Sequence, residues 1–265
     1  MSKEESPLIK KLNNCFQIQL SSSIYLSTDN HTVVLQLQFK EKIFGYLKIA
    51  NSEIGNKNIN IELDGLQKFS KLNSLYVPKI IYKSVYNDNK YFICTDLGGE
   101  HSILDYKTLK HLTSLIFKSS KVEHALNRHP RIENLIKLSR QNGLASFETN
   151  VFSSINDKKL KYKEVLEHGD FTPWNVRLHN NKLALFDFEQ FCGFGIEGFD
   201  IIKYYYSYYA HVKKYNPKTV LKKLSNILSR KEKNILILFF FKELMTAKHH
   251  ELDCSLIETY IDLIS

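Results

Sequence analysis

The sequence has little of what marks a disulfide-stapled, membrane-spanning or secreted protein. Its cysteines are scattered and form no CxxC pair, which is typical of reduced thiols in a cytosolic protein. The longest apolar run, Ile235–Phe241, is far shorter than the roughly 20 residues of a membrane-spanning helix. The N-terminus MSKEESPLIKK has no apolar core behind its charges, so we expect no secretory signal and a cytoplasmic location.

The remaining composition is that of a globular protein. With 265 residues, 43% hydrophobic and 25% charged, the chain can bury a core as one large domain or two lobes, which excludes disorder, collagen-like repeats and coiled coil. The net charge of +9 favours anionic partners such as nucleotides, phosphorylated sugars or an anionic membrane surface touched peripherally. We expect no nucleic-acid partner, because no stacking motif or recognition module accompanies the charge.

The pattern of residues changes near Gly98. Before it, Leu35, Leu37 and Phe39 alternate with polar residues, which predicts a half-buried strand, and 44–49 reads as its antiparallel partner. The other elements expected in this part are a helix over Asn58–Leu72 and a strand over Tyr91–Thr95.

The segment Asp96-Leu97-Gly98-Gly99 breaks regular structure and is suited to a hinge. Helical periodicity dominates after it. The elements expected there are helices over Tyr106–Leu126 and Arg131–Asn142, a strand–turn–strand section over Val165–Phe188, and helices from Phe199 onward. The sequence therefore predicts an α+β protein with a small antiparallel-sheet lobe, residues 1–97, and a larger, mainly helical lobe, residues 98–265.

The residues that carry chemistry lie in one segment, which reads HGDFTPWNVRL and then LALFDFEQ. Asp170 stands in an irregular loop, and Asn175 leads into a short strand. A two-residue turn at Asn180-Asn181 would place Asn175 opposite Phe186, one step from Asp187. The hairpin would thus bring an amide oxygen and a carboxylate close enough to share a hard cation such as Mg²⁺.

This layout is what phosphoryl transfer requires, because the protein must hold Mg²⁺ with oxygen ligands and meet the acceptor hydroxyl with a carboxylate. A cation for the nucleotide phosphates should come from the small lobe, where Lys48 shares a strand face with Phe44 and Tyr46. Glu62 lies on the apolar stripe of its helix, where a carboxylate is costly unless it is paired. Lys48 is its natural partner.

These motifs resemble those of the aminoglycoside phosphotransferase/choline kinase-like group within the protein-kinase-like fold. The match is carried by HGDFTPWN followed by FDFE, and by FGYLKIA followed by ELDGLQKF. The spacing from Asp170 to Asn175 is that of the kinase catalytic loop. Asp187 stands at the position of the metal-binding Asp of the Asp-Phe-Gly motif, with Glu189 in place of the Gly. Asp200 resembles the later Asp that opens a helix and holds the catalytic loop.

The resemblance implies a bilobal kinase-like fold and an ATP- and Mg²⁺-dependent kinase. It implies that Asp170 positions and deprotonates the acceptor hydroxyl, that Asn175 and Asp187 hold the metal, and that Lys48, oriented by Glu62, binds the α- and β-phosphates. The backbone of Thr95, Asp96 and Leu97 would hydrogen-bond the purine. Glu189 is either a second metal ligand or a hydrogen-bonding side chain.

The acceptor is the least determined part of this prediction. The HGDFTPWN form is similar to bacterial members linked to cell-surface glycans, and a basic chain does not favour a polycationic aminoglycoside. Trp174 is either a core anchor or a ring beside the acceptor. Asp200, Tyr204 and Tyr208 share a predicted helix face, which is either core or an aromatic wall for a sugar or a quaternary amine.

Two readings compete with a small-molecule or glycan kinase. A protein kinase is disfavoured because only a short segment separates Asp187 from Asp200. A catalytically inactive kinase fold used as a binding scaffold is favoured by one departure from the family pattern: Leu20–Thr28, where a glycine-bearing hairpin usually covers the phosphates, contains no glycine. A choline or aminoglycoside kinase is a further alternative.

Overall fold

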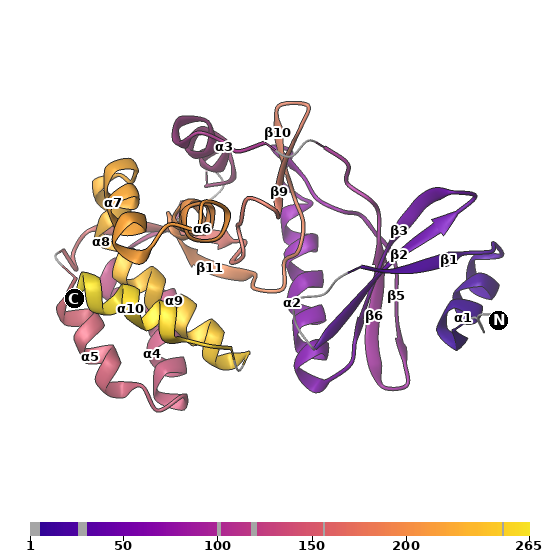
Figure 1. The fold of residues 1–265 in the computed structure, drawn as a ribbon, viewed down its shortest axis with the longest axis horizontal. Coiled ribbons are helices and arrows are strands. Elements are labelled where there is room, and N and C mark those ends of the chain that lie inside the picture. Colours follow the sequence, from indigo (N-terminus) through magenta and orange to yellow (C-terminus); the bar gives the residue numbers. More distant parts are fainter. Residues whose placement is uncertain (1–5, 26–30, 100–101, 118–120, 156, 251) are drawn as a thin grey trace. The chain divides into compact units, whose positions relative to one another are not determined.

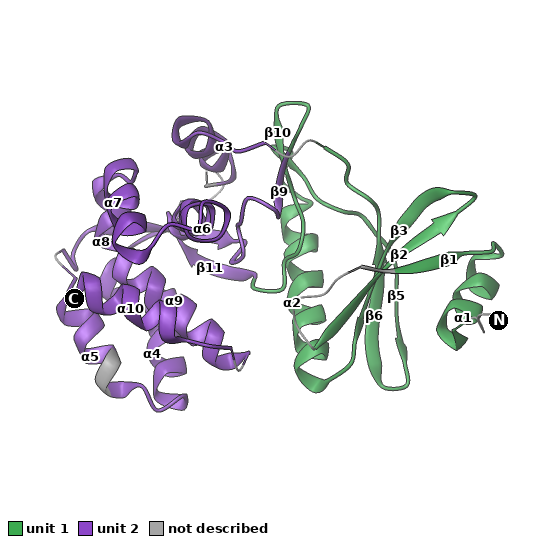
Figure 2. Cartoon of the chain, in the orientation of Figure 1, with its two compact units in different colours: residues 1–100, 178–190 green, residues 101–177, 191–265 purple. Residues whose placement is uncertain are grey.

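The computed structural model describes residues 6–25, 31–99, 102–117, 121–155, 157–250 and 252–265 (Figure 1). The chain forms two compact units, which Figure 2 colours separately. Unit 1 contains Met1–Glu100 and Leu178–Gln190, and unit 2 contains His101–Arg177 and Phe191–Ser265. The chain thus leaves unit 1 close to the expected boundary after residue 97, and it also returns to that unit for a second, short segment.

Unit 1 is built on a five-stranded antiparallel sheet in the order β1-β2-β3-β6-β5. Its strands are β1 (Ser21–Tyr25), β2 (Thr32–Phe39), β3 (Lys42–Ala50), β5 (Ile80–Tyr86) and β6 (Asn89–Cys94). Within this sheet Lys48 lies opposite Val34 on one side and Phe92 on the other. The expected antiparallel pair around Leu35 and Ile49 is present.

One helix covers each face of this sheet (Figure 1). Helix α1 (Pro7–Phe16) buries Leu8 and Leu12 in a core shared with Leu37 and Leu47. Helix α2 (Glu53–Phe69) packs on β3 and β6. It begins earlier than the expected Asn58 because the Ser52 hydroxyl accepts from Gly55 N at 3.0 Å and caps the helix there.

The returning segment of unit 1 carries a tight turn. Strands β9 (Val176–His179) and β10 (Lys182–Leu185) flank Asn180 and Asn181, both with left-handed backbone at φ 48° and 59°, as a two-residue hairpin turn requires. Strand β10 also pairs in parallel with β4 (Leu75–Tyr76). Phe188, just beyond β10, packs against Phe69 of α2 with ring centroids 5.0 Å apart. This packing ties the segment around Asp187 to α2.

Unit 2 is mainly helical around a three-stranded sheet in the order β11-β8-β7. Its strands are β7 (Glu123–Ala125), β8 (Lys161–Glu167) and β11 (Cys192–Ile196). Its helices are α3 (Tyr106–Phe117), α4 (Pro130–Gln141), α5 (Ala145–Ser153), α6 (Phe199–Ser207), α7 (Pro217–Ile227), α8 (Arg230–Asn234), α9 (Leu236–His249) and α10 (Ser255–Ile264), with a 3₁₀ turn η1 (Leu126–Arg128) and a π-helical turn η2 (Tyr208–Val212).

Helix α9 forms the centre of unit 2. Its residues from Leu236 to Met245 are all buried, which is the pattern of a helix that is apolar on every side and surrounded by neighbours. Within Leu236–Met245 the two charged residues are Lys242 and Glu243, which are also buried. None of the described helices has both the length and the apolar character needed to cross a bilayer.

Two expected helices are wrong in part. The expected helix over Tyr106–Leu126 ends at Phe117, and residues 118–120 lie outside the described residues. Glu123–Ala125 instead pairs with β8 as an antiparallel strand, because backbone pairing with a partner distant in sequence overrides local helical periodicity. The expected helix through Tyr208 ends at Ser207 and continues as the π-helical turn η2, so i+4 spacing does not hold beyond it.

Candidate active site

In unit 1 the candidate residues converge on one ammonium group. Lys48 Nζ lies 2.8 Å from both carboxylate oxygens of Glu62, 2.9 Å from Asp187 Oδ1 and 3.4 Å from Glu189 Oε1. The Glu62 side chain is only 4% exposed and that of Lys48 only 12%. Burial opposes the charge on Lys48, but Asp187, Glu62 and Glu189 outweigh it and hold the pKa of Lys48 well above its ordinary value.

The backbone of Asp187 is held in an unusual conformation. Its φ is 70°, in the left-handed region that an L-residue other than glycine adopts at a cost of order 1 kcal/mol or more. Aspartate tolerates this region better than most residues. The backbone thus departs from the extended conformation of β10 at Asp187. The Asp187 carboxylate, which is 38% exposed, forms an ion pair with Lys48. Backbone strain of this kind is concentrated at functional sites.

The carboxylates around Lys48 also form a donor set for a cation. One oxygen from each of Glu62, Asp187 and Glu189 lies within 4.8 Å of the others. Oxygen-only ligands suit a hard cation such as Mg²⁺. Glu189 is further held by the buried Thr32, whose hydroxyl lies 3.4 Å from Oε1. The donor chemistry of this cluster therefore fits the expected metal.

The other residues of unit 1 expected to contact the nucleotide lie directly after β6. Thr95 N donates to Lys79 O at 2.9 Å, and the Thr95 hydroxyl accepts from Lys79 N at 3.0 Å, so Thr95 is tied to β5 and its flank. Asp96 and Leu97 follow in the irregular segment before Gly98, whose φ is 60°. Within the glycine-free stretch Leu20–Thr28, residues 26–28 lie outside the described residues, and the preceding part forms β1.

In unit 2 the loop His168–Asn175 is held from several sides. Asp200, at the start of α6, accepts from His168 N at 2.9 Å and from Gly169 N at 3.1 Å. Gly169 has φ 85°, so glycine is required there, and its carbonyl accepts from Lys242 Nζ at 2.9 Å. The buried His168 ring packs edge-on against Phe171, with ring centroids 5.7 Å apart, which agrees with a structural role for His168.

Both carboxylate oxygens of Asp170 have partners. Asn175 Nδ2 donates to Asp170 Oδ2 at 2.8 Å and to the Asp170 carbonyl at 3.1 Å, while Lys203 Nζ lies 3.3 Å from Asp170 Oδ1. The carboxylate is 22% exposed, so it is oriented by the protein and still reached by solvent. Both hydrogen bonds of Asn175 use its nitrogen, and the amide oxygen is the atom that a hard cation would take.

Lys203 connects Asp170 to an alternating series of buried charges in unit 2. Its successive contacts join oppositely charged residues at 3.1, 3.4, 3.2, 2.6 and 3.3 Å. The series, which we call the buried charge chain, runs Arg131, Glu167, Lys242, Glu243, Lys203 and Asp170. Each interior member thus has a partner on both sides, which offsets the large cost of burying its charge.

The pKa values of the chain members, and of Asp200 beside Glu167, follow from burial and from the charges that surround each group. Burial opposes the charge of Lys203, but Glu243 and Asp170 raise the pKa of Lys203 above its ordinary value. Burial likewise disfavours the charged form of Glu243, yet Lys203 and Lys242 lower its pKa. Burial and the neighbouring Glu167 raise the pKa of Asp200 to about 7, against the two backbone N–H groups that favour its charged form.

The structure thus gathers the sequence-predicted residues into two sets, one in each unit. Lys48, Glu62, Asp187 and Glu189 meet in unit 1, and Asp170 meets Asn175 in unit 2. Sequence reasoning missed the buried charge chain behind Asp170. A signal of it was present in the sequence, because Lys242 and Glu243 interrupt the otherwise apolar run from Leu236 to Met245 and buried charges must be paired.

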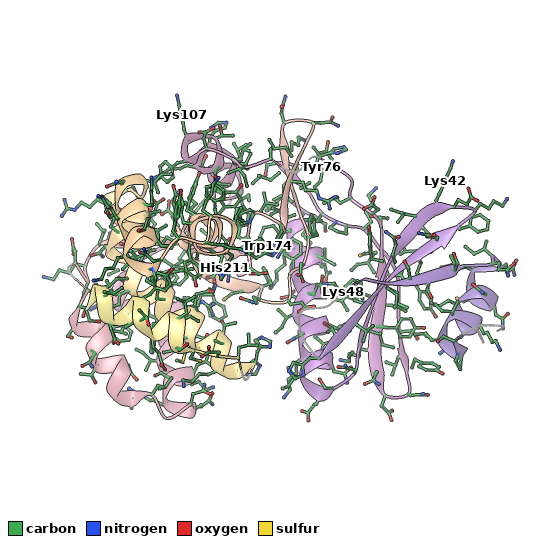
Figure 3. The ribbon with its side chains drawn as sticks, viewed as in Figure 1. Lys42, Lys48, Tyr76, Lys107, Trp174 and His211 are labelled. Carbon is green, nitrogen blue, oxygen red and sulfur yellow. The ribbon has the colours of Figure 1, made fainter. Side chains whose placement is uncertain are left out.

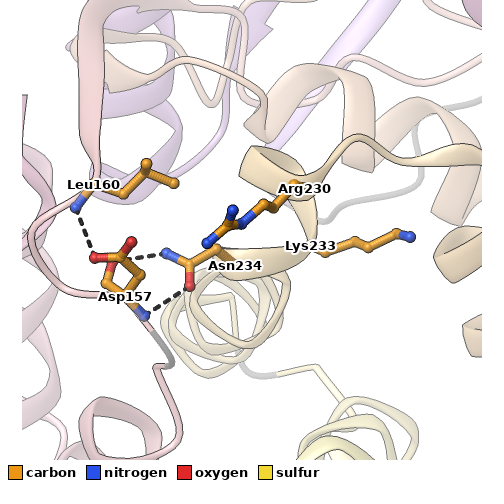
Figure 4. Close-up of a pocket in the computed structure, with 5 residues that line it drawn as sticks. All are labelled: Asp157, Leu160, Arg230, Lys233 and Asn234. Carbon is orange, nitrogen blue, oxygen red and sulfur yellow. Dashed lines mark hydrogen bonds between the residues drawn. The ribbon is translucent and has the colours of Figure 1, made fainter.

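A cavity of about 300 Å³ also lies within unit 2, lined by Asp157, Leu160, Arg230, Lys233 and Asn234 (Figure 4). Some of its polar groups bond to one another, because Asn234 exchanges hydrogen bonds with the backbone of Asp157 at 2.9 and 3.0 Å. None of its lining residues belongs to the Asp170 loop or to the buried charge chain.

Comparison with known proteins finds similarity in structure without similarity in sequence. No family model and no curated protein matches the chain. Among solved structures, a candidate fructosamine-3-kinase from Haemophilus somnus 129PT matches with a TM-score of 0.61 and 11% identity over 97% of this chain and 95% of its own. The macrolide 2'-phosphotransferase of Brachybacterium faecium matches at 0.58 and 10%, over 97% and 96%. An amicoumacin kinase in complex with AMP-PNP and Ca²⁺ matches at 0.57 and 13%, over 100% and 96%.

These similarities span nearly the whole of both chains, so they concern the complete fold. The chain has the fold of the aminoglycoside phosphotransferase-like small-molecule kinases, with an antiparallel-sheet part followed by a helical part. The resemblance drawn from HGDFTPWN and FDFE is confirmed at the level of the fold.

The carboxylate cluster predicts the behaviour of a Lys48→Met variant. Removing the ammonium leaves three carboxylates close together, so we expect a loss of about 3–5 kcal/mol of unfolding free energy at low divalent cation. Added Mg²⁺ should raise its melting temperature more than that of the wild type. Lys42→Met, an exposed site on the same strand (Figure 3), is the matched control and should change little. A Lys48→Met protein as stable as the control would contradict the account of this cluster.

The buried charge chain predicts non-additive stability changes. Lys203→Met should cost about 3–5 kcal/mol, because Glu243 and Asp170 both lose a partner. Adding Glu243→Met should recover part of that loss, since Lys203→Met has already removed the ammonium that faces this carboxylate. Chemical denaturation of both single variants and the double variant measures the coupling, with the exposed Lys222→Met as control. Strict additivity would show that the pair is not coupled in solution.

Proposed function

We propose that this chain is an ATP- and Mg²⁺-dependent phosphotransferase that phosphorylates a hydroxyl of a small molecule or glycan. The observation that supports it best is that a kinase-like fold carries oriented acidic and basic groups in both units: Lys48 with its carboxylates, and Asp170 with Asn175. The similar structures are those of phosphotransferases, and one of them is a complex with a nucleotide analogue and a divalent cation.

Each side chain has a distinct proposed role. Asp170, with one oxygen held by Asn175 and the other near Lys203, accepts the proton of the acceptor hydroxyl. The hydroxyl oxygen then forms a new bond to the γ-phosphorus. The bond from that phosphorus to the bridging oxygen breaks, and ADP leaves with the electron pair.

Lys48 binds the α- and β-phosphates in this proposal, and Glu62 keeps it oriented. Phosphate oxygens would replace Asp187 and Glu189 as its partners. The released carboxylates of Asp187 and Glu189 are the groups of unit 1 that would hold Mg²⁺. When bound, the ion neutralises charge on the nucleotide phosphates. The purine would meet the backbone of the segment from Thr95 to Leu97, with Asp96 and Leu97 as its donors and acceptors because the Thr95 N–H is already used by Lys79.

The finer assignments extend this proposal. A glycan of a bacterial cell surface is the acceptor we favour over an aminoglycoside or choline, since a net charge of +9 disfavours cations. All four cysteines are free thiols, which fits a cytoplasmic protein, and any contact with an anionic membrane would be peripheral.

Thermal unfolding with and without Mg·ATP tests the proposal in the wild type, in Asp187→Asn and in Asp64→Ala. Nucleotide at about a hundred times its dissociation constant should add roughly 2.7 kcal/mol, a shift of several degrees that requires Mg²⁺. Asp187→Asn retains a side chain that tolerates the left-handed backbone but loses the charge, so we expect the shift to disappear.

Asp64, exposed on α2, is the matched control and should shift as the wild type does. The absence of any shift in the wild type would favour the binding-scaffold reading. A shift that persists in Asp187→Asn would remove Asp187 from the metal site.

A further inference from the structure

Trp174 is an exposed ring on a rigid loop. It is the only tryptophan of the chain, and it is 44% exposed between Pro173 and Asn175, which are both buried. The loop backbone is fixed by hydrogen bonds from Thr172 N to Asp170 O at 2.9 Å and from Asn175 N to Thr172 O at 3.0 Å. A large apolar ring is therefore exposed to water in the same loop as Asp170, although such a ring is ordinarily buried in the core.

His211 is the ring neighbour of Trp174, and both residues are labelled in Figure 3. The ring centroids of Trp174 and His211 are 6.2 Å apart with an interplanar angle of 70°, and the buried Tyr206 supports His211 from another side at 5.5 Å. His211 belongs to the π-helical turn η2, and turns of this type are frequent at functional sites. The imidazole therefore borders the indole with at least one side open to solvent.

The electrostatic surroundings of His211 connect it to Asp170. Partial burial and the charge of Lys203 lower the pKa of His211, while Glu243 and Asp170 act in the opposite direction. At neutral pH the imidazole is thus predominantly uncharged, with one nitrogen that donates and one that accepts. This is the hydrogen-bonding capacity that a hydroxyl group matches.

The charges around Trp174 and His211 do not favour a cation. Asp170 is paired with Lys203, and Glu243 is paired with both Lys203 and Lys242. Lys213 and Lys214, both exposed, directly follow η2. The carboxylates of Asp170 and Glu243 are thus already neutralised, so a cationic acceptor would be repelled by the excess of positive charge in this part of the chain. Cation–π binding to the indole would have to overcome this repulsion.

We propose that Trp174 and His211 form the acceptor-binding platform, and that the acceptor is a sugar carrying no positive charge. The apolar face of the sugar ring would lie on the indole, one of its hydroxyls would hydrogen-bond to His211, and the reacting hydroxyl would face Asp170. An amphipathic ring with a polar edge suits a sugar, whose C–H groups and hydroxyls lie on different sides. This inference rests on the proposed function and narrows its acceptor.

Intrinsic fluorescence tests the platform directly, because every photon of tryptophan emission comes from residue 174. The wild-type protein is titrated with free hexoses, N-acetylhexosamines, hexose phosphates, kanamycin and choline, and each titration is repeated on N-acetyltryptophanamide to detect collisional quenching. We expect a saturable change with at least one of the sugars or sugar phosphates and none with kanamycin or choline.

Two variants test whether His211 contributes to sugar binding. His211→Ala should weaken sugar binding about tenfold, the usual consequence of losing one hydrogen bond, and should leave the Mg·ATP thermal shift unchanged. His249→Ala, an exposed histidine at the end of α9, is the matched control and should bind as the wild type does. Equal affinity in both variants would remove His211 from the site.

The remaining outcomes overturn the inference in distinguishable ways. A response to kanamycin or choline alone would show a cationic acceptor. No response to any sugar, in a protein that still shifts with Mg·ATP, would refute the platform and leave the phosphotransferase proposal standing. Sugar binding in a protein that shows no nucleotide-dependent shift would support the platform and contradict the proposed function.

Discussion

The ion pair between Lys203 and Asp170 is the constraint on which the candidate site of unit 2 depends, because it fixes one oxygen of the proposed base. Lys203 can be buried there only because Glu243 neutralises it from the other side at 2.6 Å. Glu243 in turn belongs to α9, the helix at the centre of the unit. The position of the Asp170 carboxylate is therefore set largely by the packing of two core helices, α6 and α9. The loop itself fixes only the other carboxylate oxygen, through Asn175.

In unit 1 the excess of charge has the opposite arrangement, with several carboxylates around one ammonium group. There a single ammonium, that of Lys48, holds together three carboxylates that would otherwise repel one another. In the proposed function this cluster exchanges its partners: phosphate oxygens would take the ammonium, and a divalent cation would take the carboxylates of Asp187 and Glu189. A nucleotide with its metal ion fits this arrangement because it brings both signs of charge together.

Several features of the candidate site could be predicted from single residues. A carboxylate on the apolar stripe of a helix requires a partner, which led from Glu62 to Lys48, and the loop composition around Asp170 indicated irregular structure. The buried charge chain was not predicted, because the partners of Lys203 and Lys242 are brought together only by tertiary packing. The expected helix beyond Phe117 was wrong for a related reason, since Glu123–Ala125 pairs with a strand that periodicity cannot reveal.

The central claim is that Asp170 accepts the proton of the acceptor hydroxyl that attacks the γ-phosphorus of ATP. Single-turnover ADP formation with the sugar panel, in the wild type and in Asp170→Asn, tests it most directly. The account predicts that Asp170→Asn binds Mg·ATP as the wild type does and forms ADP at least about a hundredfold more slowly. An unchanged rate in Asp170→Asn would contradict it, as would a wild-type protein that binds Mg·ATP and transfers phosphate to no hydroxyl.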